Sequence, residues 1–320
     1  MGTKNKVMTI ASTIDANYLL PLSVLACSLM RNKGDTSRID WFVFESGIPE
    51  QAKNDFDRHY RDSDIGFHWV TLSAAEFEHL PHWGRAVPRM YQRLVIADYL
   101  PTDISTILYL DADLLVLGNI EELRDVELDN MAVGAVQDMV IPTVSSPLGL
   151  SKHKEMGISP AAHYFNAGVL LMDLTMWRKE RISQKTISYL EKSEQIGFMD
   201  QDALNAILHS SWKPLHYRWN VVGSVAGRRF FDPQHLDREQ YDEAVRMPGI
   251  VHFGGYLKPW QIPRLGNRWD VEYKRYLAHQ HLDYSFNSSM LGNLYSLYDR
   301  FFRWFLYSLE REVWKRIKQK

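Results

Sequence analysis

The feature that most constrains the fold is a regular alternation of short apolar runs and helical patterns in the first third of the chain. Strand-like runs occupy residues 7–11, 39–45, 66–72 and 105–110, and helical patterns lie between them at residues 17–32, 49–61 and 90–99. Repeated strand–helix–strand units place parallel strands side by side and cover both faces of the sheet with helices. We therefore predict an α/β fold with a mostly parallel sheet.

The second half of the chain is less regular. Strands are expected at residues 131–136, 165–171 and 250–253, and helices at 182–192 and 201–208. The stretches 139–163 and 220–248 show no pattern that predicts an element. The character changes again near the C-terminus, where aromatic and basic residues dominate. We therefore expect one domain over residues 1–284 and an appended segment over residues 285–320.

Composition excludes several classes of protein. The 320 residues carry 37 Lys and Arg against 39 Asp and Glu, and this balance does not favour a nucleic-acid partner. A single cysteine, Cys27, excludes a disulfide scaffold and indicates reducing, intracellular surroundings. No run reaches the roughly 18 apolar residues of a membrane span, and the N-terminus lacks the pattern of a signal peptide. We expect a cytoplasmic protein.

The strongest chemical signal is Asp111-Ala112-Asp113, which directly follows the apolar run ILYL. Ligands of open parallel sheets bind beyond the carboxyl ends of the strands. Alternate side chains of an extended segment share a face, so the two carboxylates would converge on one divalent cation. An Asx turn that ends the strand explains the same residues equally well.

Two further groups of residues carry weaker signals. Asp200-Gln201-Asp202 precedes an apolar helix, and one of its two acids, Asp200 or Asp202, is expected to cap that helix. His252 ends the run IVHF and is followed by two glycines and Lys258. A histidine at a strand end is usually structural, but here it offers a metal ligand, and Lys258 offers a partner for phosphate.

Read in order, five blocks resemble one family. The blocks are IDANY at 14–18, LYLDADLLV at 108–116, YFNAGVLLMDL at 164–174, DQDALN at 200–205 and HFGGYLKPW at 252–260. Their order and spacing resemble the retaining glycosyltransferases of family 8, which include bacterial lipopolysaccharide galactosyl- and glucosyltransferases and glycogenin. The resemblance covers roughly residues 7–262. It implies a single Rossmann-like nucleotide-sugar transferase domain of the GT-A type, with a mixed, mostly parallel sheet.

The resemblance also implies roles for particular residues. Asp111, Asp113 and His252 match the ligands of Mn²⁺, with Mg²⁺ as the alternative ion. The positions that match contacts to the nucleotide-sugar are Ile14, Asp15, Ala16, Asn17, Tyr18, Arg93, Ala112, Asp138, Asn166, Ala167, Gly255 and Lys258. The positions that match the catalytic set are Asp111, Asp113, Asp200 and Gln201. Ala16 replaces an acidic residue of several members, and Met199 stands at a position that is often polar, so both leave sugar selectivity open.

The function implied is transfer of a hexose, glucose or galactose, from a UDP-sugar to a glycan or glycolipid acceptor, in lipopolysaccharide or surface polysaccharide synthesis. Gln201 is a poor nucleophile, which favours front-face attack over a covalent intermediate. A haloacid-dehalogenase-type phosphatase also begins its motif with an Asp after a strand, but position 115 is Leu where that motif has Thr or Val. A catalytically silent protein that binds UDP-sugars is the other alternative.

The C-terminal residues 299–320 predict an amphipathic helix. Its apolar face comprises Phe301, Phe302, Phe305, Leu306, Leu309, Val313 and Ile317, and Arg303, Arg311, Lys315 and Lys318 lie mostly opposite, with Arg316 on the apolar side. This segment has seven basic and three acidic residues, a net charge of +4, which leaves 30 and 36, a net charge of −6, for the rest. Such a helix suits an anionic membrane surface, and packing on protein explains it equally well. No oligomeric state follows from the sequence.

Overall fold

The computed structural model describes residues 7–36, 38–81, 88–193, 197–223, 236–255, 258–261 and 267–278. The chain divides into two compact units, Met1–His252 and Phe253–Lys320, which are described separately. The predicted C-terminal helix and the predicted boundary at residue 285 lie outside the described residues.

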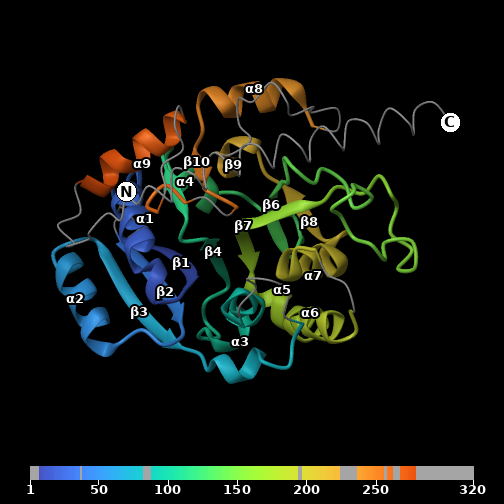
Figure 1. The fold of residues 1–320 in the computed structure, drawn as a ribbon, viewed down its shortest axis with the longest axis horizontal. Coiled ribbons are helices and arrows are strands. Elements are labelled where there is room, and N and C mark those ends of the chain that lie inside the picture. Colours follow the sequence, from blue (N-terminus) through green and yellow to red (C-terminus); the bar gives the residue numbers. More distant parts are fainter. Residues whose placement is uncertain are drawn as a thin grey trace, which may run out of the picture. The chain divides into compact units, whose positions relative to one another are not determined.

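The first unit is built around a seven-stranded sheet with the order β3-β2-β1-β4-β7-β6-β8 (Figure 1). Its strands are β1 (Val7–Ile14), β2 (Arg38–Glu45), β3 (Ile65–Thr71), β4 (Thr106–Leu110), β6 (Val133–Gln137), β7 (Phe165–Asp173) and β8 (Trp212–Pro214). Four neighbouring pairs are parallel, whereas β7 runs antiparallel to both β4 and β6. The prediction of a mixed, mostly parallel sheet is confirmed.

A smaller sheet with the order β5-β10-β9 lies in the same unit. Its strands are β5 (Leu114–Val116), β9 (Val221–Val222) and β10 (Ile250–His252). β10 runs antiparallel to β5 and parallel to β9, so His252 is placed opposite Leu114. This pairing brings the end of β10 next to the residues that follow β4, although the two segments are far apart in the sequence.

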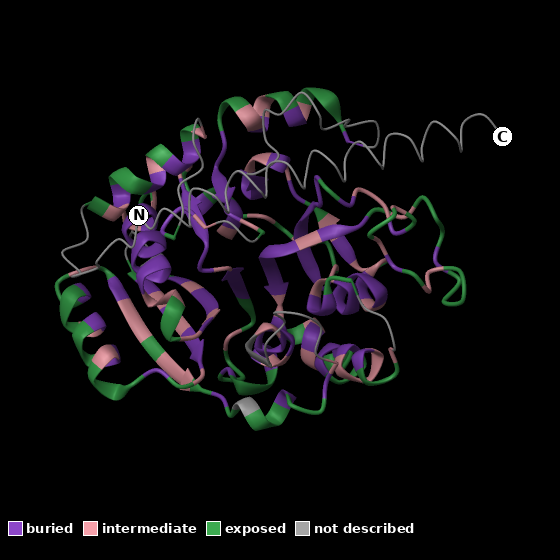
Figure 2. Cartoon of the chain, viewed as in Figure 1, coloured by how far each residue is buried: buried purple, intermediate pink, exposed green. Residues whose placement is uncertain are grey.

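Helices pack on both faces of the large sheet, because successive residues of β1 belong to two different cores. Ile10 belongs to a core that includes Leu22 and Leu25 of helix α1 (Leu19–Arg31). Its neighbour Ala11 belongs to a second core, which includes Trp177 and Leu204. Successive side chains of a strand point to opposite faces, so a strand covered on both sides is apolar throughout. Figure 2 shows this contrast between the buried central strands and the partly exposed edge strand β3.

The remaining helices connect these strands. They are α2 (Glu50–Tyr60), α3 (Ile96–Tyr99), α4 (Glu121–Arg124), α5 (Leu174–Lys179), α6 (Ile182–Glu191), α7 (Met199–Leu208) and α8 (Arg238–Arg246), with α9 (Arg268–Ala278) in the second unit. The described ranges also contain the 3₁₀ helices η1 (Ala16–Tyr18), η2 (Ala74–Phe77), η3 (Pro88–Val95) and η4 (Tyr217–Asn220). Within the described residues, none of the helices is long and apolar enough to span a membrane.

Some local predictions were wrong. The helix expected over residues 90–99 is mostly the 3₁₀ helix η3, and only its last four residues are α-helical. Helices α4, α5, α8 and α9 and strands β5, β8 and β9 were missed. The three strands are only two or three residues long, too short for a periodic pattern, and α8 is a polar helix with just two buried residues. The unpatterned stretch 139–163 packs its apolar residues into a small core that also includes Ala206 of α7.

Candidate active site

The candidate site lies where several strands of the first unit end or begin. β4 ends at Leu110, directly before Asp111, and β6 ends at Gln137, directly before Asp138. Because β7 is antiparallel to both strands, its first residues lie at the same edge, where the backbone N–H of Asp111 donates to the carbonyl of Gly168 over 2.9 Å. The carboxyl edge of the parallel strands thus gathers side chains from distant parts of the chain.

Asp111, Asp113 and His252 form the centre of the site. One ligand atom from each lies within 4.8 Å of the other two. His252 Nε2 is 3.4 Å from Asp113 Oδ1 and 3.8 Å from Asp111 Oδ2. Ala112 and Asp113 form a turn between β4 and β5, so the carboxylates converge through this turn. The expectation of an extended segment was therefore wrong, while the predicted convergence itself is present.

The donor set of this cluster fits a divalent metal ion. Two carboxylate oxygens and one imidazole nitrogen are hard and borderline ligands, which suit Mn²⁺ and also accommodate Mg²⁺. The side chains of Asp113 and His252 are 10 % and 8 % exposed, so like charges here are poorly screened by water without a cation. The cluster is a candidate metal site, and its geometry alone does not select the ion.

Arg93 joins the metal-site carboxylate Asp111 to Asp200. Its Nη2 lies 2.9 Å from Asp111 Oδ1, its Nε lies 2.7 Å from Asp200 Oδ2, and its Nη1 donates to the carbonyl of Ala167 over 2.9 Å. The guanidinium also stacks over the ring of Tyr109, whose hydroxyl donates to Asp111 Oδ1 over 2.7 Å. Oδ1 of Asp111 thus takes these two short contacts, whereas Oδ2 accepts a longer hydrogen bond from Arg93 Nη1, over 3.4 Å, and is the oxygen that faces His252.

This network shifts the pKa values of its members. Burial raises the pKa of Asp200 to about 6; Arg93 opposes that shift and the nearby Asp111 adds to it. Burial alone would lower the pKa of Arg93, but Asp111 and Asp200 outweigh burial and raise it, so the guanidinium stays charged. Removing one partner of such a buried pair typically costs about 3–5 kcal/mol.

The second acidic pair has a divided role. Asp202 Oδ2 accepts hydrogen bonds from the backbone N–H groups of Gly197 and Phe198, both over 2.9 Å, and Oδ1 accepts one from Tyr164 over 2.5 Å. Asp202 therefore holds the turn before α7, and Asp200 is the acid that faces Arg93. Met199, which directly precedes Asp200, adopts a φ of 40°, in the left-handed region that is costly for a residue with a side chain.

Gln201, Asn166 and Asp138 form a hydrogen-bonded group beside the metal cluster. Asp138 Oδ2 accepts from Asn166 Nδ2 over 2.8 Å and from Gln201 Nε2 over 3.1 Å. Asp138 Oδ1 accepts from the backbone N–H groups of Val140 and Ile141. The other end of Gln201, Oε1, accepts from the backbone N–H of Ala167 over 3.0 Å. The side-chain amide of Gln201 is thus held at both ends.

The predicted nucleotide loop follows β1. Ile14 is the buried last residue of β1, and Asp15 caps η1 by accepting from the backbone N–H of Asn17 over 3.0 Å. Ala16 and Asn17 are exposed, whereas Tyr18 is half-buried. Burial, followed by the charges of Asp113 and Asp111, raises the pKa of the Tyr18 hydroxyl. Tyr18 therefore lies within electrostatic reach of the metal cluster.

Gly255 and Lys258 belong to the second unit. Gly255 adopts a φ of 96°, which favours glycine. Lys258 Nζ donates to the carbonyl of Phe253 over 2.9 Å and lies 5.8 Å from the centre of the Trp260 ring. Their predicted contact with a diphosphate stays a prediction.

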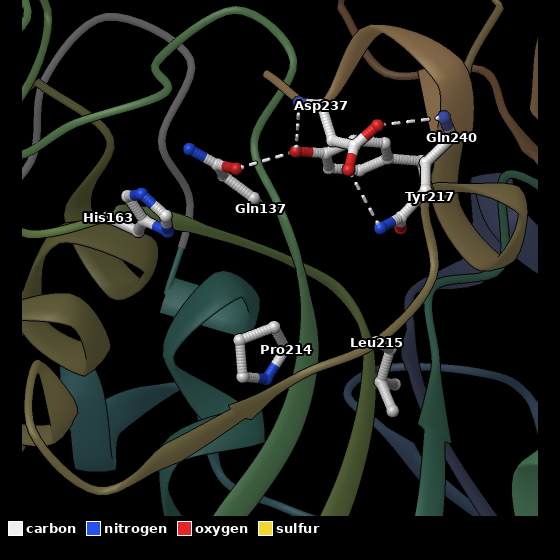
Figure 3. Close-up of a pocket in the computed structure, with 7 residues that line it drawn as sticks. All are labelled: Gln137, His163, Pro214, Leu215, Tyr217, Asp237 and Gln240. Atoms are coloured by element: carbon white, nitrogen blue, oxygen red, sulfur yellow. Dashed lines mark hydrogen bonds between the residues drawn. The ribbon is translucent and has the colours of Figure 1, made fainter. Parts of the chain in front are cut away.

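A cavity of about 230 Å³ lies near the end of β6, and Figure 3 shows its lining. Its lining residues are Gln137, His163, Pro214, Leu215, Tyr217, Asp237 and Gln240. The hydroxyl of Tyr217 donates to Gln137 Oε1 over 2.7 Å and accepts from the backbone N–H of Asp237 over 3.2 Å (Figure 3). Asp237 in turn caps α8. These polar groups bind one another and tie the start of α8 to β6.

Three residues of the site region were not predicted from the sequence. Tyr109 positions Asp111, Asn220 contacts His252, and Gly168 provides the space in which the His252 ring lies. Gly168 is the glycine of the block YFNAGVLLMDL. A glycine within a strand often marks a place where another group packs closely on the backbone, so the sequence did contain a signal for this contact. Asn220 directly precedes the β-branched pair Val221-Val222, which forms β9. A strand predicted from this pair would have put Asn220 at a strand end.

Comparison with known proteins identifies the class. The model of glycosyl transferase family 8 matches residues 9–262. A crystal structure of the galactosyltransferase LgtC, in complex with donor and acceptor sugar analogues, has the same fold with a TM-score of 0.71 and 24 % identity. The match covers 86 % of this chain and 97 % of that one. The chain belongs to glycosyl transferase family 8 and is a retaining hexosyltransferase.

Particular relatives are similar over most of their length. General stress protein A of Bacillus subtilis is 30 % identical over 264 residues, which cover 80 % of this chain and 88 % of the relative. The lipopolysaccharide 1,2-glucosyltransferase of Escherichia coli is 23 % identical over 260 residues, covering 80 % and 73 % respectively. Neither the fold nor these relatives support the haloacid-dehalogenase-type phosphatase.

Proposed function

We propose that the chain transfers glucose or galactose from a UDP-sugar to a glycan or glycolipid acceptor, in lipopolysaccharide or surface polysaccharide synthesis. The observation that carries the proposal is the convergence of Asp111, Asp113 and His252 at the carboxyl edge of a family 8 fold. The similarity to a lipopolysaccharide 1,2-glucosyltransferase and to a lipopolysaccharide 1,3-galactosyltransferase supports the choice of hexose and of acceptor.

Asp111, Asp113 and His252 would hold Mn²⁺, or Mg²⁺ in its place. When bound, the ion offsets the negative charge that develops on the diphosphate as the anomeric bond breaks. Tyr18 is proposed to stack on the uracil, and Asp15 and Asn17 to read its edge. Ile14, Ala16 and Ala112 would contact the nucleotide through the backbone. Gly255 and Lys258 are proposed to bind the diphosphate.

Arg93, Asp138, Asn166, Ala167, Asp200 and Gln201 are proposed to surround the donor sugar. Retention of configuration requires either a covalent intermediate or attack on the face that the leaving group departs from. Gln201 is an uncharged amide held at both ends, Asp138 accepts four hydrogen bonds, and Asp200 is paired with Arg93. These contacts favour front-face attack, with a phosphate oxygen of the leaving group accepting the proton of the acceptor hydroxyl.

The direct test is to incubate the protein with Mn²⁺ and a panel of UDP-sugars and to measure UDP release. We expect release with one hexose donor, loss of release with a chelator, and at least a hundred-fold loss in Asp111→Asn, because an amide is a weaker ligand for a hard cation. Full turnover by Asp111→Asn would contradict the metal assignment. UDP binding without transfer over a wide acceptor panel would favour the catalytically silent alternative.

The covalent route has its own test in Gln201→Glu. A carboxylate at this position introduces a nucleophile, and mass spectrometry after incubation with donor detects a glycosyl adduct if the site supports double displacement. We expect no adduct and a slower transfer, because the new carboxylate would face Asp138 Oδ2 where the Gln201 amide now donates. An adduct on the introduced carboxylate would overturn front-face attack.

Association with the inner face of the membrane remains a proposal from the sequence. The aromatic, basic composition of residues 299–320 supports it. Deleting residues 288–320 is expected to abolish sedimentation with anionic liposomes and to leave UDP release on a water-soluble acceptor intact. Unchanged liposome binding would show that the segment packs on protein instead.

A further inference from the structure

A chain of side-chain amides connects His252 to the residues around the proposed donor sugar. His252 Nδ1 lies 3.0 Å from Asn220 Oδ1, and Asn220 Nδ2 donates to Asn166 Oδ1 over 2.8 Å. Asn166 Nδ2 donates in turn to Asp138 Oδ2 over 2.8 Å. Asn220 and His252 are 1 % and 6 % exposed, so water competes little for these groups. The orientation of each amide is therefore set by its neighbours.

A backbone group fixes the direction of the hydrogen bonds in this series of amides. The N–H of Gly168 can only donate, and it does so to Asn166 Oδ1 over 2.9 Å. Asn166 Oδ1 is therefore the acceptor, and the group of Asn220 that faces it must be its NH₂. Asn220 consequently presents its oxygen to His252, because an amide carries its oxygen and nitrogen on opposite sides.

This direction decides where the imidazole carries its proton. A neutral imidazole has one N–H and one bare nitrogen, and the partner of one nitrogen sets the state of the other. With an oxygen facing Nδ1, the proton belongs on Nδ1, and the lone pair of Nε2 points toward Asp113 and Asp111, at 3.4 and 3.8 Å. Without such a partner, the two carboxylates would attract a proton to Nε2 and block it as a ligand.

Gly168 also fixes the position of the ring. A Cβ at Gly168 would lie 2.4 Å from Cε1 and 2.7 Å from Nδ1 of His252, closer than real contacts allow. The ring therefore rests directly on the backbone of β7, and the same glycine supplies the N–H from which the orientation of Asn166 and Asn220 follows. Ring position and proton position thus depend on one short segment of β7.

We propose that Asn220, oriented by Asn166, is a positioning residue that holds His252 in the Nδ1–H form and so keeps Nε2 available to a divalent cation between Asp111 and Asp113. The inference rests on the metal site of the proposed function. It goes beyond that function by assigning a role to a residue that contacts neither cation nor substrate. Such partners of a ligating histidine typically change metal affinity by about 10–100-fold when removed.

The first experiment needs no metal. Nitrogen-15 NMR of histidine-labelled, chelator-treated protein at alkaline pH reports which ring nitrogen carries the proton, and His252→Gln identifies the signal. We expect the proton on Nδ1 in the wild type. In Asn220→Ala the nearest acceptors are the carboxylates beside Nε2, so the proton should move there. A wild-type proton on Nε2 overturns the proposal, whatever the variants do.

The second experiment measures Mn²⁺ affinity by electron paramagnetic resonance, with no sugar present. Asn220→Ala is expected to weaken binding about 10–100-fold. Asn220→Asp keeps an acceptor for Nδ1–H and is expected to keep the Nδ1–H form and to bind Mn²⁺ more tightly than Asn220→Ala does. A role in packing alone would give the two variants the same ring state and the same affinity.

Asn32→Ala is the matched control, because Asn32 also uses its side-chain NH₂ to bind carbonyls, those of Ser28 and Val116, and makes no contact with His252. It should leave ring state and affinity unchanged. If the wild type binds no Mn²⁺, the metal site and the role of Asn220 toward it both fail. If Mn²⁺ binds and Asn220→Ala retains both the Nδ1–H form and full affinity, only the role of Asn220 fails.

Discussion

Two segments of this chain have the same pattern, an acid on each side of one residue, and the structure uses them in opposite ways. Asp111 and Asp113 turn toward each other and toward His252, with ligand atoms within 4.8 Å. Asp200 and Asp202 point to different partners, Arg93 for the first and the turn at Gly197 for the second. Within the described part of the chain, only the first pair belongs to a candidate cation site.

The backbone explains the difference. Asp111 directly precedes a turn between β4 and β5 and Asp113 lies in that turn, and there the two side chains converge although they are two positions apart. Asp200 and Asp202 lie in the first turn of α7, and residues two apart on a helix are about 200° apart around its axis. A pair of acids therefore has to be interpreted together with the element that carries it.

The most direct test of this difference is to exchange one acid in each pair for its amide. Asp113→Asn removes a proposed ligand, and we expect Mn²⁺ affinity to fall at least about 100-fold. Asp202→Asn removes a carboxylate that accepts three hydrogen bonds, and we expect the free energy of unfolding to fall by about 1–3 kcal/mol. Calorimetric titration with Mn²⁺ and denaturant unfolding measure the two effects.

The exchange should separate the two pairs cleanly. Asp202→Asn is expected to bind Mn²⁺ as the wild type does. If it lost affinity as Asp113→Asn does, the second pair would belong to the cation site, and the division between the pairs would be wrong.

A smaller loss of Mn²⁺ affinity is expected from Gly168→Ala, which tests what holds His252 beside Asp111 and Asp113. The added methyl group would collide with the ring of His252, so the imidazole must shift away from the carboxylates. We expect Mn²⁺ affinity to fall about 10–100-fold. Gly134→Ala in the neighbouring strand β6 is the control, because its methyl group would meet only the ends of Leu128 and Leu215, at 3.0 and 3.3 Å. Equal affinities of the two variants would contradict the close approach of His252 to β7.

The last effect concerns pH and the second pair. The pKa of Asp200 rises from an ordinary 3.8 to about 6, so between these values the folded, metal-free protein holds a proton that the unfolded chain has released. The free energy of unfolding therefore falls as pH rises through this window, by up to about 3 kcal/mol. Asp200→Asn has no carboxyl to titrate there, so wild-type stability relative to the variant should decline from pH 4 to pH 6. If the difference in unfolding free energy between wild type and variant stayed constant or rose over this range, burial would not be the main cause of the raised pKa of Asp200.

Much of the site was predictable because it lies in continuous stretches of sequence. Asp111 and Asp113 follow an apolar strand, and His252 follows another, so their place at strand ends could be inferred from the residues alone. The strands of the first 110 residues and the helices α1 and α2 were likewise found, whereas the segment 90–99 is mostly a 3₁₀ helix. These predictions depend on local patterns, which are present in the sequence itself.

The remaining parts of the site depend on contacts between distant residues. Asn220 is a single polar residue whose partners, His252 and Asn166, are 32 and 54 positions away. The expectation that Asp200 or Asp202 caps α7 was wrong, because Phe198 is the N-cap residue and no side chain makes a capping hydrogen bond there. Asp200 instead faces Arg93 and Asp202 binds the turn before the helix, and both contacts depend on the tertiary structure. The turn at Ala112 was one of two alternatives left open, because the strand that follows it has three residues and is too short to show a pattern.

By itself, the sequence determined the α/β class, the succession of the main strands along the chain, the family resemblance and the types of residue available as ligands. These properties follow from periodicity and from motifs, each contained in a short segment. The tertiary structure decided which acids converge, which oxygen of Asp111 faces His252, and that Asn220 contacts the ring. It did so because the pairing of β10 with β5 and of β7 with β4 brings together residues that no local pattern relates.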